Sequence, residues 1–439
     1  MVMFNFLQLI VLGLLASRPA VSLSLGQAIQ SVSSFEDGLK IASEFWLPSD
    51  PNLPPHYQQQ VHHEKRQRWA SQVIEKIFSK DDNTVGLKLL KDDRFDRIVH
   101  AAAMPHEATI DRPNKEGIWI LASLEGLHGI IARKLELESI CHVENILLPS
   151  TLKAIEKIIE RACQVSVHYS LDQACQLHWI IKGLYERIPE LEECKEGKEL
   201  QQRVSVLPFD IVPRGLDWNE ISPSSPSEPL LCDKLIDEIP FNKDTIVTRR
   251  GQSVTERRGT AWIAKEGIGA LAYSGKLMNP KPIPSVVSKA MRLVEDRLSL
   301  ESNFFDCALC NHYADASAAC KFHTDPEHGS FWHRTTVVVA AGSDRKFAFK
   351  PINADWNDWD PLKVDSQQAT AAAIHLFSGD LVVMKDNCND DFYHAVHSGE
   401  SDNDRVSLVL KRALDRNGKK GHGEQGQGRR SRRKLRIKR

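Results

Sequence analysis

No apolar run in this sequence is long enough to cross a membrane with ease. The run from Met3 to Ala16 has 14 residues, against the roughly 20 that a spanning helix needs. Its length suits the apolar core of a signal peptide, and Ala20 and Ser22 offer a small-residue cleavage site, although no Lys or Arg precedes it. We therefore expect residues 1–22 to be a signal peptide or import leader and expect no stable membrane span. Such a leader indicates the secretory pathway or an organelle, with the nucleus or cytoplasm as the alternative.

The chain also lacks net charge, because 57 Lys and Arg residues face 58 Asp and Glu residues. This balance hides a strong asymmetry. Residues 416–439 hold eleven Lys or Arg and one acidic residue, about +10, so the rest of the chain carries about −11. The Gly-rich tail at 415–439 is predicted to be disordered. Its composition fits a solvated end and an arm for phosphates or anionic surfaces equally well.

A disulfide framework and a zinc ribbon are both missing from the cysteine pattern. The nine cysteines are odd in number, and the one CxxC, at Cys307 and Cys310, is followed by no second pair at zinc spacing. The surrounding letters, "NFFDCALCNHY", are typical of a strand. We interpret these two thiols as buried structural groups.

Between residues 25 and 206 the sequence predicts an all-α region. Apolar residues recur every three or four positions over residues 116–138, 149–166 and 170–188, and the last stretch opens with a capping-box spacing from Ser170 to Gln173. Short breaks between them favour antiparallel helical hairpins. No repeat period is clear enough to indicate a named solenoid. This region could bind a protein or a nucleic acid.

A composition change divides the chain into several domains. Pro and Ser residues mark 207–232 as a linker. From 233 to 414 the pattern changes to short β-rich runs, with one helix expected at 285–300. Strands are expected within residues 304–313, 335–342, 346–351, 374–386 and 405–413, spaced as in an antiparallel sandwich or barrel.

One constellation in this β-rich part could hold a metal. His323 and Asp325 lie two residues apart, so on a strand they share one face. An HxD pair alone is weak evidence, but His394 follows 71 residues later, just beyond the strand-like "SGDLVVM". Two histidines and one carboxylate on one side of an ion form the facial triad of non-haem Fe(II) oxygenases, which leaves positions open for a cosubstrate and dioxygen.

The strand "RVSLVLK" supplies a candidate cosubstrate pocket. With a period of two, Arg405, Ser407 and Lys411 share one face, opposite an apolar face. The planar fork of Arg405 can then clamp a carboxylate from inside the domain. By the same rule Asn311 and Tyr313 share a face and could assist as polar donors.

These segments together resemble a known family. In order and spacing, "NHY", "FHTDPEHG", "RTTVVVAAGSDRKFAF", "FSGDLVVM", "FYHAV" and "RVSLVLK" are similar to the AlkB family of Fe(II)- and 2-oxoglutarate-dependent dioxygenases. Upstream, "ERRGTAWIAKEGIGALAYSG" resembles the nucleotide-recognition lid of AlkB demethylases. The resemblance covers about residues 255–412 and leaves the helical half outside.

The resemblance implies a double-stranded β-helix (jelly-roll) dioxygenase domain with flanking helices, acting as an oxidoreductase with Fe(2+) and 2-oxoglutarate. It further implies oxidative demethylation of N-methylated nucleobases in methylated DNA or RNA, as in DNA repair, by a monomer that releases formaldehyde and succinate. The implied iron ligands are His323, Asp325 and His394, and the implied cosubstrate residues are Arg405, Asn311, Tyr313, Ser407 and Lys411. The implied substrate residues are Tyr273, which would stack on the base, Arg257 and Arg258, which would meet flanking phosphates, and Glu327.

The sequence departs from the family pattern at two positions. The family usually has a second arginine where this chain has Lys411, which keeps the charge but loses the fork, and Pro326 stiffens the loop after Asp325. Three alternatives stay open: a β-sandwich with unrelated polar residues, an Fe(II)/2-oxoglutarate oxygenase acting on a protein or small molecule, and a binding protein with a degenerate oxygenase fold. The leader supports the second, and the intact triad argues against the third.

Overall fold

The structure is a computed structural model that describes eleven stretches of the chain: residues 70–74, 93–103, 113–138, 147–191, 194–221, 231–247, 251–273, 276–325, 328–352, 371–399 and 402–414. The expected leader at 1–22 and the basic tail at 415–439 lie outside these residues. No described helix combines the length and the apolar character needed to cross a lipid bilayer.

The described helices precede most of the strands along the chain. The helices are α6 (Asp93–Ala102), α7 (Pro113–Glu138), α8 (Pro149–Val165), η3 (Ser166–His168), α9 (Leu171–Arg187), α10 (Lys195–Val204), η4 (Trp218–Glu220), α11 (Leu231–Glu238), α12 (Ser285–Arg297) and α13 (Cys388–Asp391). The strands are β1 (Phe209–Val212), β2 (Thr245–Val247), β3 (Ser253–Thr255), β4 (Gly259–Ala264), β5 (Leu271–Tyr273), β6 (Lys276–Met278), β7 (Cys307–Tyr313), β8 (Cys320–His323), β9 (Thr336–Gly342), β10 (Arg345–Pro351), β11 (Ala372–Leu376), β12 (Leu381–Met384), β13 (Phe392–Val396) and β14 (Arg405–Lys411).

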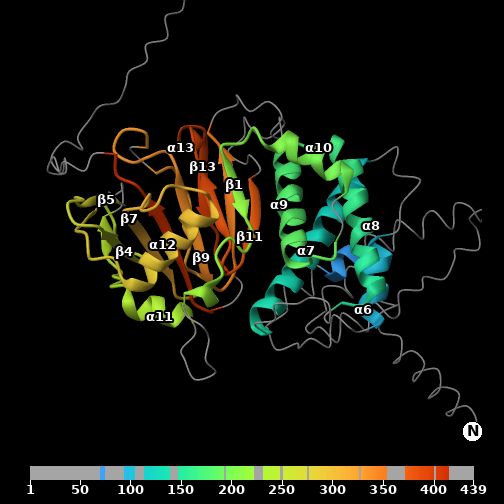
Figure 1. Cartoon of the computed structure of the whole chain (residues 1–439), viewed down its shortest axis with the longest axis horizontal. Helices are drawn as coiled ribbons and strands as arrows, with labels where there is room; N and C mark the ends of the chain where they lie inside the picture. The colour runs from blue at the N-terminus through green and yellow to red at the C-terminus, as the bar shows by residue number, and fades with distance from the viewer. Residues whose placement is uncertain are drawn as a thin grey trace, which may run out of the picture.

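The strands form two main antiparallel sheets (Figure 1). The major sheet has the order β1-β12-β9-β14-β7-β4, and the minor sheet has the order β11-β10-β13-β8. Two further hairpins are β2-β3 and β5-β6, and the segment that resembles a lid, residues 256–275, contains β4 and β5. Helices plus antiparallel sheets are the expected architecture of this part of the chain, and the predicted helix at 285–300 is confirmed as α12.

The two faces of strand β14 agree with the prediction that alternate residues of this strand point to opposite sides of the sheet. Val406, Leu408 and Leu410 belong to a core cluster that the major sheet forms with α11 and α12. The opposite face carries polar side chains, yet Arg405 and Lys411 there are only 0% and 3% exposed. A polar face that is buried needs partners inside the protein, and this one points to the space between the two sheets.

The helical part matches three of the predicted helices, which correspond to α7, α8 and α9. The predicted capping box is present, since the Ser170 backbone N–H donates to Gln173 Oε1 at 3.2 Å. The part of the predicted helical region before residue 70 lies outside the described residues. Helix α9 covers the edge strand β11, and Gln176 Nε2 donates to the Ala373 carbonyl at 2.9 Å. This hydrogen bond satisfies one carbonyl of the edge strand, and the helix covers an edge that would otherwise be open to pairing.

The segment 207–232, which the sequence predicted to be a linker, contains a strand. Within this segment Phe209–Val212 forms β1 and pairs antiparallel with β12. The Pro and Ser content suggested an irregular connection, but β1 is short and fits between Pro208 and Pro213. Phe209 stacks on Phe349 of β10 with ring centroids 3.8 Å apart, and Trp179 of α9 lies 5.8 Å from Phe209. One core cluster therefore runs from the helices into the sandwich.

A polar network ties α7 to the minor sheet. The Asp344 carboxylate accepts hydrogen bonds from Arg133 at 3.2 and 3.3 Å and from His375 Nδ1 at 2.7 Å. Burial alone would raise the pKa of Asp344. The hydrogen bond from His375 and the charge of Arg133 outweigh it and hold the pKa well below its usual range. The carboxylate thus stabilises the joint in its ionised form.

We expect Asp344→Asn to destabilise the protein by about 3 kcal/mol at pH 7, because it removes one partner of a buried ion pair. Since the folded pKa is depressed, the carboxylate's contribution is fully present above its unfolded pKa of about 3.9 and is lost as pH falls below it. Urea unfolding of parent and variant from pH 7 down to pH 3 should show the difference shrinking with acid. Asp237→Asn, at an exposed position of α11, should change little at any pH, and an equal difference for Asp344→Asn at every pH would contradict the assignment.

The CxxC thiols are buried, as predicted. Cys307 and Cys310 are each 0% exposed and, three residues apart on β7, belong to core clusters on opposite sides of the sheet. Burial raises the pKa of both thiols. The two sulfurs therefore cannot act together on one metal or one disulfide.

Candidate metal and cosubstrate site

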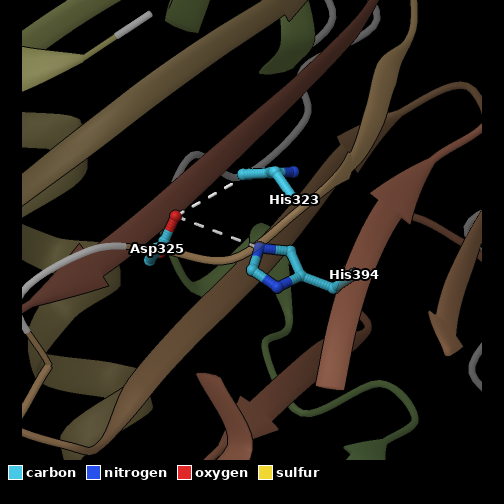
Figure 2. Close-up of side chains that lie close together, drawn as sticks. All are labelled: His323, Asp325 and His394. Atoms are coloured by element: carbon cyan, nitrogen blue, oxygen red, sulfur yellow. Dashed lines mark ion pairs between the residues drawn. The ribbon is translucent and has the colours of Figure 1, made fainter. Parts of the chain in front are cut away.

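Three side chains that the sequence suggested as metal ligands meet between the two sheets. His323 ends β8 and His394 lies on the neighbouring β13, directly opposite in the strand register. Asp325 follows two residues after His323, and its Oδ1 lies 3.7 Å from His323 Nε2 and 4.0 Å from His394 Nε2 (Figure 2). One ligand atom from each residue falls within 4.8 Å of the others. This is the donor set of a 2-His-1-carboxylate site.

Hydrogen bonds and burial prepare these side chains as ligands. His323 Nδ1 lies 2.8 Å from the Lys321 carbonyl, so a proton there donates to that oxygen and leaves Nε2 as the donor to a metal. Burial lowers the pKa of His394 to about 3, which keeps its imidazole neutral. Phe347 lies parallel to the His394 ring, with centroids 6.0 Å apart. Burial also acts to lower the pKa of His323, but the hydrogen bond with Cys320 and the charge of Asp325 outweigh it and raise that pKa to about 9, so a metal would have to displace a proton from this imidazole.

Lys411 holds the other oxygen of the candidate carboxylate ligand. Its Nζ donates to Asp325 Oδ2 at 2.6 Å and lies 3.2 Å from His328 Nε2. Burial acts to raise the pKa of Asp325, but the Lys411 charge outweighs it and the pKa lies well below its usual value. The backbone N–H of Asp325 also donates to Asn389 Oδ1 at 2.9 Å. Oδ1 is thereby left to face the two histidines.

Arg405 has the geometry expected of a buried carboxylate clamp. It is fully buried, and its Nη1 donates to the carbonyls of Ser343 and Leu376, both at 3.1 Å. Its Nε and Nη2, the two parallel donors of the fork, have no partner within the described residues. The same holds for the buried hydroxyl of Ser407, two residues along the same face. Unpaired buried donors are costly, so these groups suit the carboxylate of a ligand such as 2-oxoglutarate.

The strand register brings the remaining cosubstrate candidates to this pocket. Tyr313 pairs with Arg405, and Asn311 pairs with Ser407, across the β7–β14 ladder. Tyr313 is 1% exposed and Asn311 is 5% exposed. The predicted shared face of these residues thus lies next to the predicted face of β14.

The two arginines of the lid segment lie differently. Arg257 is exposed, as a phosphate contact would require. Arg258 instead turns inward, where its Nε donates to Asn311 Oδ1 at 3.1 Å and its Nη2 donates to the Tyr273 hydroxyl at 2.7 Å. Its third nitrogen, Nη1, donates to the Ala319 carbonyl at 3.2 Å. Arg258 therefore connects the lid to β7 in this structure.

Tyr273 is the last residue of β5, and its hydroxyl accepts the hydrogen bond from Arg258. Burial raises the pKa of Tyr273 well above its usual value, and the Cys320 thiol and the Asp325 carboxylate are among the charges that act on it. Glu327 and Pro326 lie outside the described residues, so the expectation about Glu327 stays a prediction.

Several residues at this site were not singled out from the sequence. Asn389 and His328 contact the group around Asp325, and the Cys320 thiol lies 3.6 Å from His323 Nδ1. Asn389 sits on the short helix α13, just before β13. Its position before "FYHAV" was the one local signal, since it precedes a candidate ligand by five residues.

Comparison with known proteins found one matching family model, and that family uses iron and 2-oxoglutarate, as the donor set suggests. Residues 222–433 match the model of the 2OG-Fe(II) oxygenase superfamily. "Uncharacterized protein R406" of Acanthamoeba polyphaga mimivirus is 28% identical over 184 residues, which cover 41% of this chain and 86% of that protein. A solved structure described as "The structure of OsALKBH1" is similar over 47% of this chain and 96% of that chain, with 17% identity and a TM-score of 0.29.

Proposed function

We propose that this chain, an Fe(II)- and 2-oxoglutarate-dependent dioxygenase, demethylates N-methylated nucleobases in DNA or RNA. When bound, Fe(2+) would allow dioxygen to react with 2-oxoglutarate and the methyl group: one oxygen atom would enter succinate as CO₂ leaves, and the other would hydroxylate the N-methyl group, which would then leave as formaldehyde. The observation that carries the proposal is the position of Tyr273, an aromatic residue of the lid segment that Arg258 connects to Asn311, one of the candidate cosubstrate residues.

The roles of the site residues follow from their contacts. His323, Asp325 and His394 would hold the iron through Nε2, Oδ1 and Nε2. Arg405 would bind the distal carboxylate of 2-oxoglutarate with its unpaired Nε and Nη2. Asn311, Tyr313 and Ser407 would complete the polar lining.

Tyr273 would serve as the stacking platform for the base. An N-methyl group inside a stacked duplex is out of reach of an iron between two sheets, so the nucleotide has to be single-stranded or extruded. Aromatic stacking is worth roughly 1–3 kcal/mol per base. Arg258 contacts the phenol twice, because its Nη2 donates to the Tyr273 hydroxyl and its guanidinium lies over the ring, 5.7 Å from the centroid. The base would therefore have to stack on the ring face that Arg258 does not cover. Exposed Arg257 would meet a flanking phosphate.

We expect Tyr273→Ala to reduce demethylation of a methylated single-stranded oligonucleotide by about 5- to 150-fold, the equivalent of the lost stacking energy. Turnover of 2-oxoglutarate without nucleic acid should be preserved, because the variant leaves the metal and cosubstrate residues in place. Formaldehyde and succinate, measured in parallel, separate the two activities. Tyr273→Phe is the matched control, since it keeps the ring and removes only the hydroxyl that Arg258 contacts, and it should retain most of the demethylation.

Two outcomes would argue against this proposal. Equal losses of both activities in Tyr273→Ala would indicate that the ring only packs the lid. A parent enzyme that consumes 2-oxoglutarate but releases no formaldehyde from any methylated oligonucleotide would favour the second candidate function, oxidation of a protein or small-molecule substrate. The expected leader supports this second candidate, and so does the inward turn of Arg258, which leaves Arg257 as the outward-facing member of the arginine pair.

A further inference from the structure

Two cysteine sulfurs of the helical region lie in contact, far from the metal site in the sequence. Cys163 is in the last turn of α8 and is 2% exposed, and Cys194 is the residue that immediately precedes α10. Their Sγ atoms are 3.5 Å apart, although 31 positions separate them. A disulfide bond requires about 2.05 Å. An approach of about 1.5 Å would therefore close a bond between them.

The surroundings of the pair suit thiol chemistry at Cys194. This residue is half-exposed and lies at the N-terminus of the ten-residue helix α10, where the helix dipole favours a thiolate. The next turn contributes Gly197, which has no side chain to cover the sulfur. By contrast, Cys175, Cys232 and Cys388 are buried, and burial raises the pKa of each of them. Cys194 thus combines an accessible sulfur with a position at a helix N-terminus that favours its thiolate form, and it contacts a second cysteine.

We propose that Cys163 and Cys194 form a reversible disulfide bond with each other. The oxidant would be a low-molecular-weight disulfide such as oxidised glutathione. The Cys194 thiolate attacks one sulfur of the oxidant, forming a mixed disulfide and releasing one small thiol. The Cys163 thiol then loses its proton and attacks Cys194 Sγ, which forms the protein disulfide and releases a second small thiol. Two electrons pass from the two cysteines to the oxidant, which is reduced to two thiols.

The disulfide bond would cross-link the helical region that packs against the minor sheet. It would close a loop that contains all of α9, the helix whose Gln176 contacts β11 and whose Trp179 packs on Phe209 and Phe349. Cross-linking such a loop removes conformational freedom from the unfolded chain. Oxidation is therefore expected to raise the thermal stability of the helical region, and reduction is expected to reverse the gain. An odd number of cysteines is compatible with one such pair.

The test uses the full chain, incubated with oxidised glutathione or with dithiothreitol and then denatured and labelled with N-ethylmaleimide. Intact mass should show two fewer labels after oxidation, and a tryptic digest should contain a peptide joining Cys163 to Cys194. The oxidised protein should melt at a higher temperature, and dithiothreitol should abolish the difference. Cys175→Ser, which alters a buried cysteine of α9, is the matched control and should behave like the parent.

Cys163→Ser should stop at the first step, with one glutathione retained on Cys194 and no rise in melting temperature. Three results would overturn the proposal. These are full labelling of both residues after oxidation, a cross-link of either residue to a different cysteine, and a stable glutathione adduct on Cys194 in the parent. If Cys163→Ser folds poorly, Cys194→Ser gives an equivalent test, because it removes the attacking thiol and should lose no label beyond background.

Discussion

Replacing His394 by alanine is expected to abolish iron-dependent succinate formation while leaving the protein folded. Its Nε2 supplies one of three candidate ligand atoms, and two remaining ligands hold Fe(II) poorly. Asp325→Ala should be equally inactive, but it also leaves Lys411 buried without its carboxylate, which is expected to cost about 3–5 kcal/mol of stability. His394→Ala is therefore the cleaner variant, and His323→Ala should agree with it.

The measurement is anaerobic loading with Fe(II) and 2-oxoglutarate, followed by oxygen and quantification of succinate. Thermal unfolding of each apoprotein shows whether the variant is folded. His397→Ala is the matched control, because His397 follows the same strand three residues later and its ring contacts Phe322 instead of the candidate ligands. Near-parental succinate formation by His394→Ala, or an equal loss in His397→Ala, would refute the assignment of the triad.

The extent to which the sequence predicted this site depended on how local each signal was. The period of two on β14 correctly predicted that Arg405, Ser407 and Lys411 share an inward face, because alternation along a strand is a local property. The helical periods that became α7, α8 and α9 were equally local. The strand β1 was not predicted, because four residues between two prolines give too little pattern to distinguish a strand from a linker.

The contacts between distant segments could not be read from the sequence. Lys411 meets Asp325 across 86 positions, and that meeting depends on how β14 lies opposite the turn after β8. The inward turn of Arg258 depends in the same way on Asn311, a partner 53 positions away. A strand pattern gives the face on which a side chain lies, but the strand order of the sheet decides which partner it finds. The contact between α7 and the minor sheet through Asp344 was not predicted for the same reason.

Lys411→Met is expected to weaken metal binding by roughly 10- to 100-fold, the range found when a group that orients a ligand is removed. Lys411 Nζ donates to Asp325 Oδ2, while Oδ1 faces both histidines. Without the charge, a buried carboxylate loses its main compensation, so it binds protons more readily and turns more freely. Methionine has a similar length and no charge, so the variant fills the space that lysine occupied. Activity should recover in part as iron is raised, because the ligands themselves remain.

Lys411→Arg separates charge from shape at this position. It restores the cation and should keep metal binding nearer to the parent value than Lys411→Met does, although its planar fork has different donor directions from an ammonium. Arg412→Met is the control one residue along, where the side chain is out of phase, partly exposed and paired with Glu301. It should bind metal like the parent. Titration of each apoprotein with Mn(II), as a redox-stable stand-in for Fe(II), gives the affinities directly. If Lys411→Met and the parent bind equally well, the lysine does not orient the carboxylate, and its role then has to be sought at the cosubstrate, as the spacing from Arg405 first suggested.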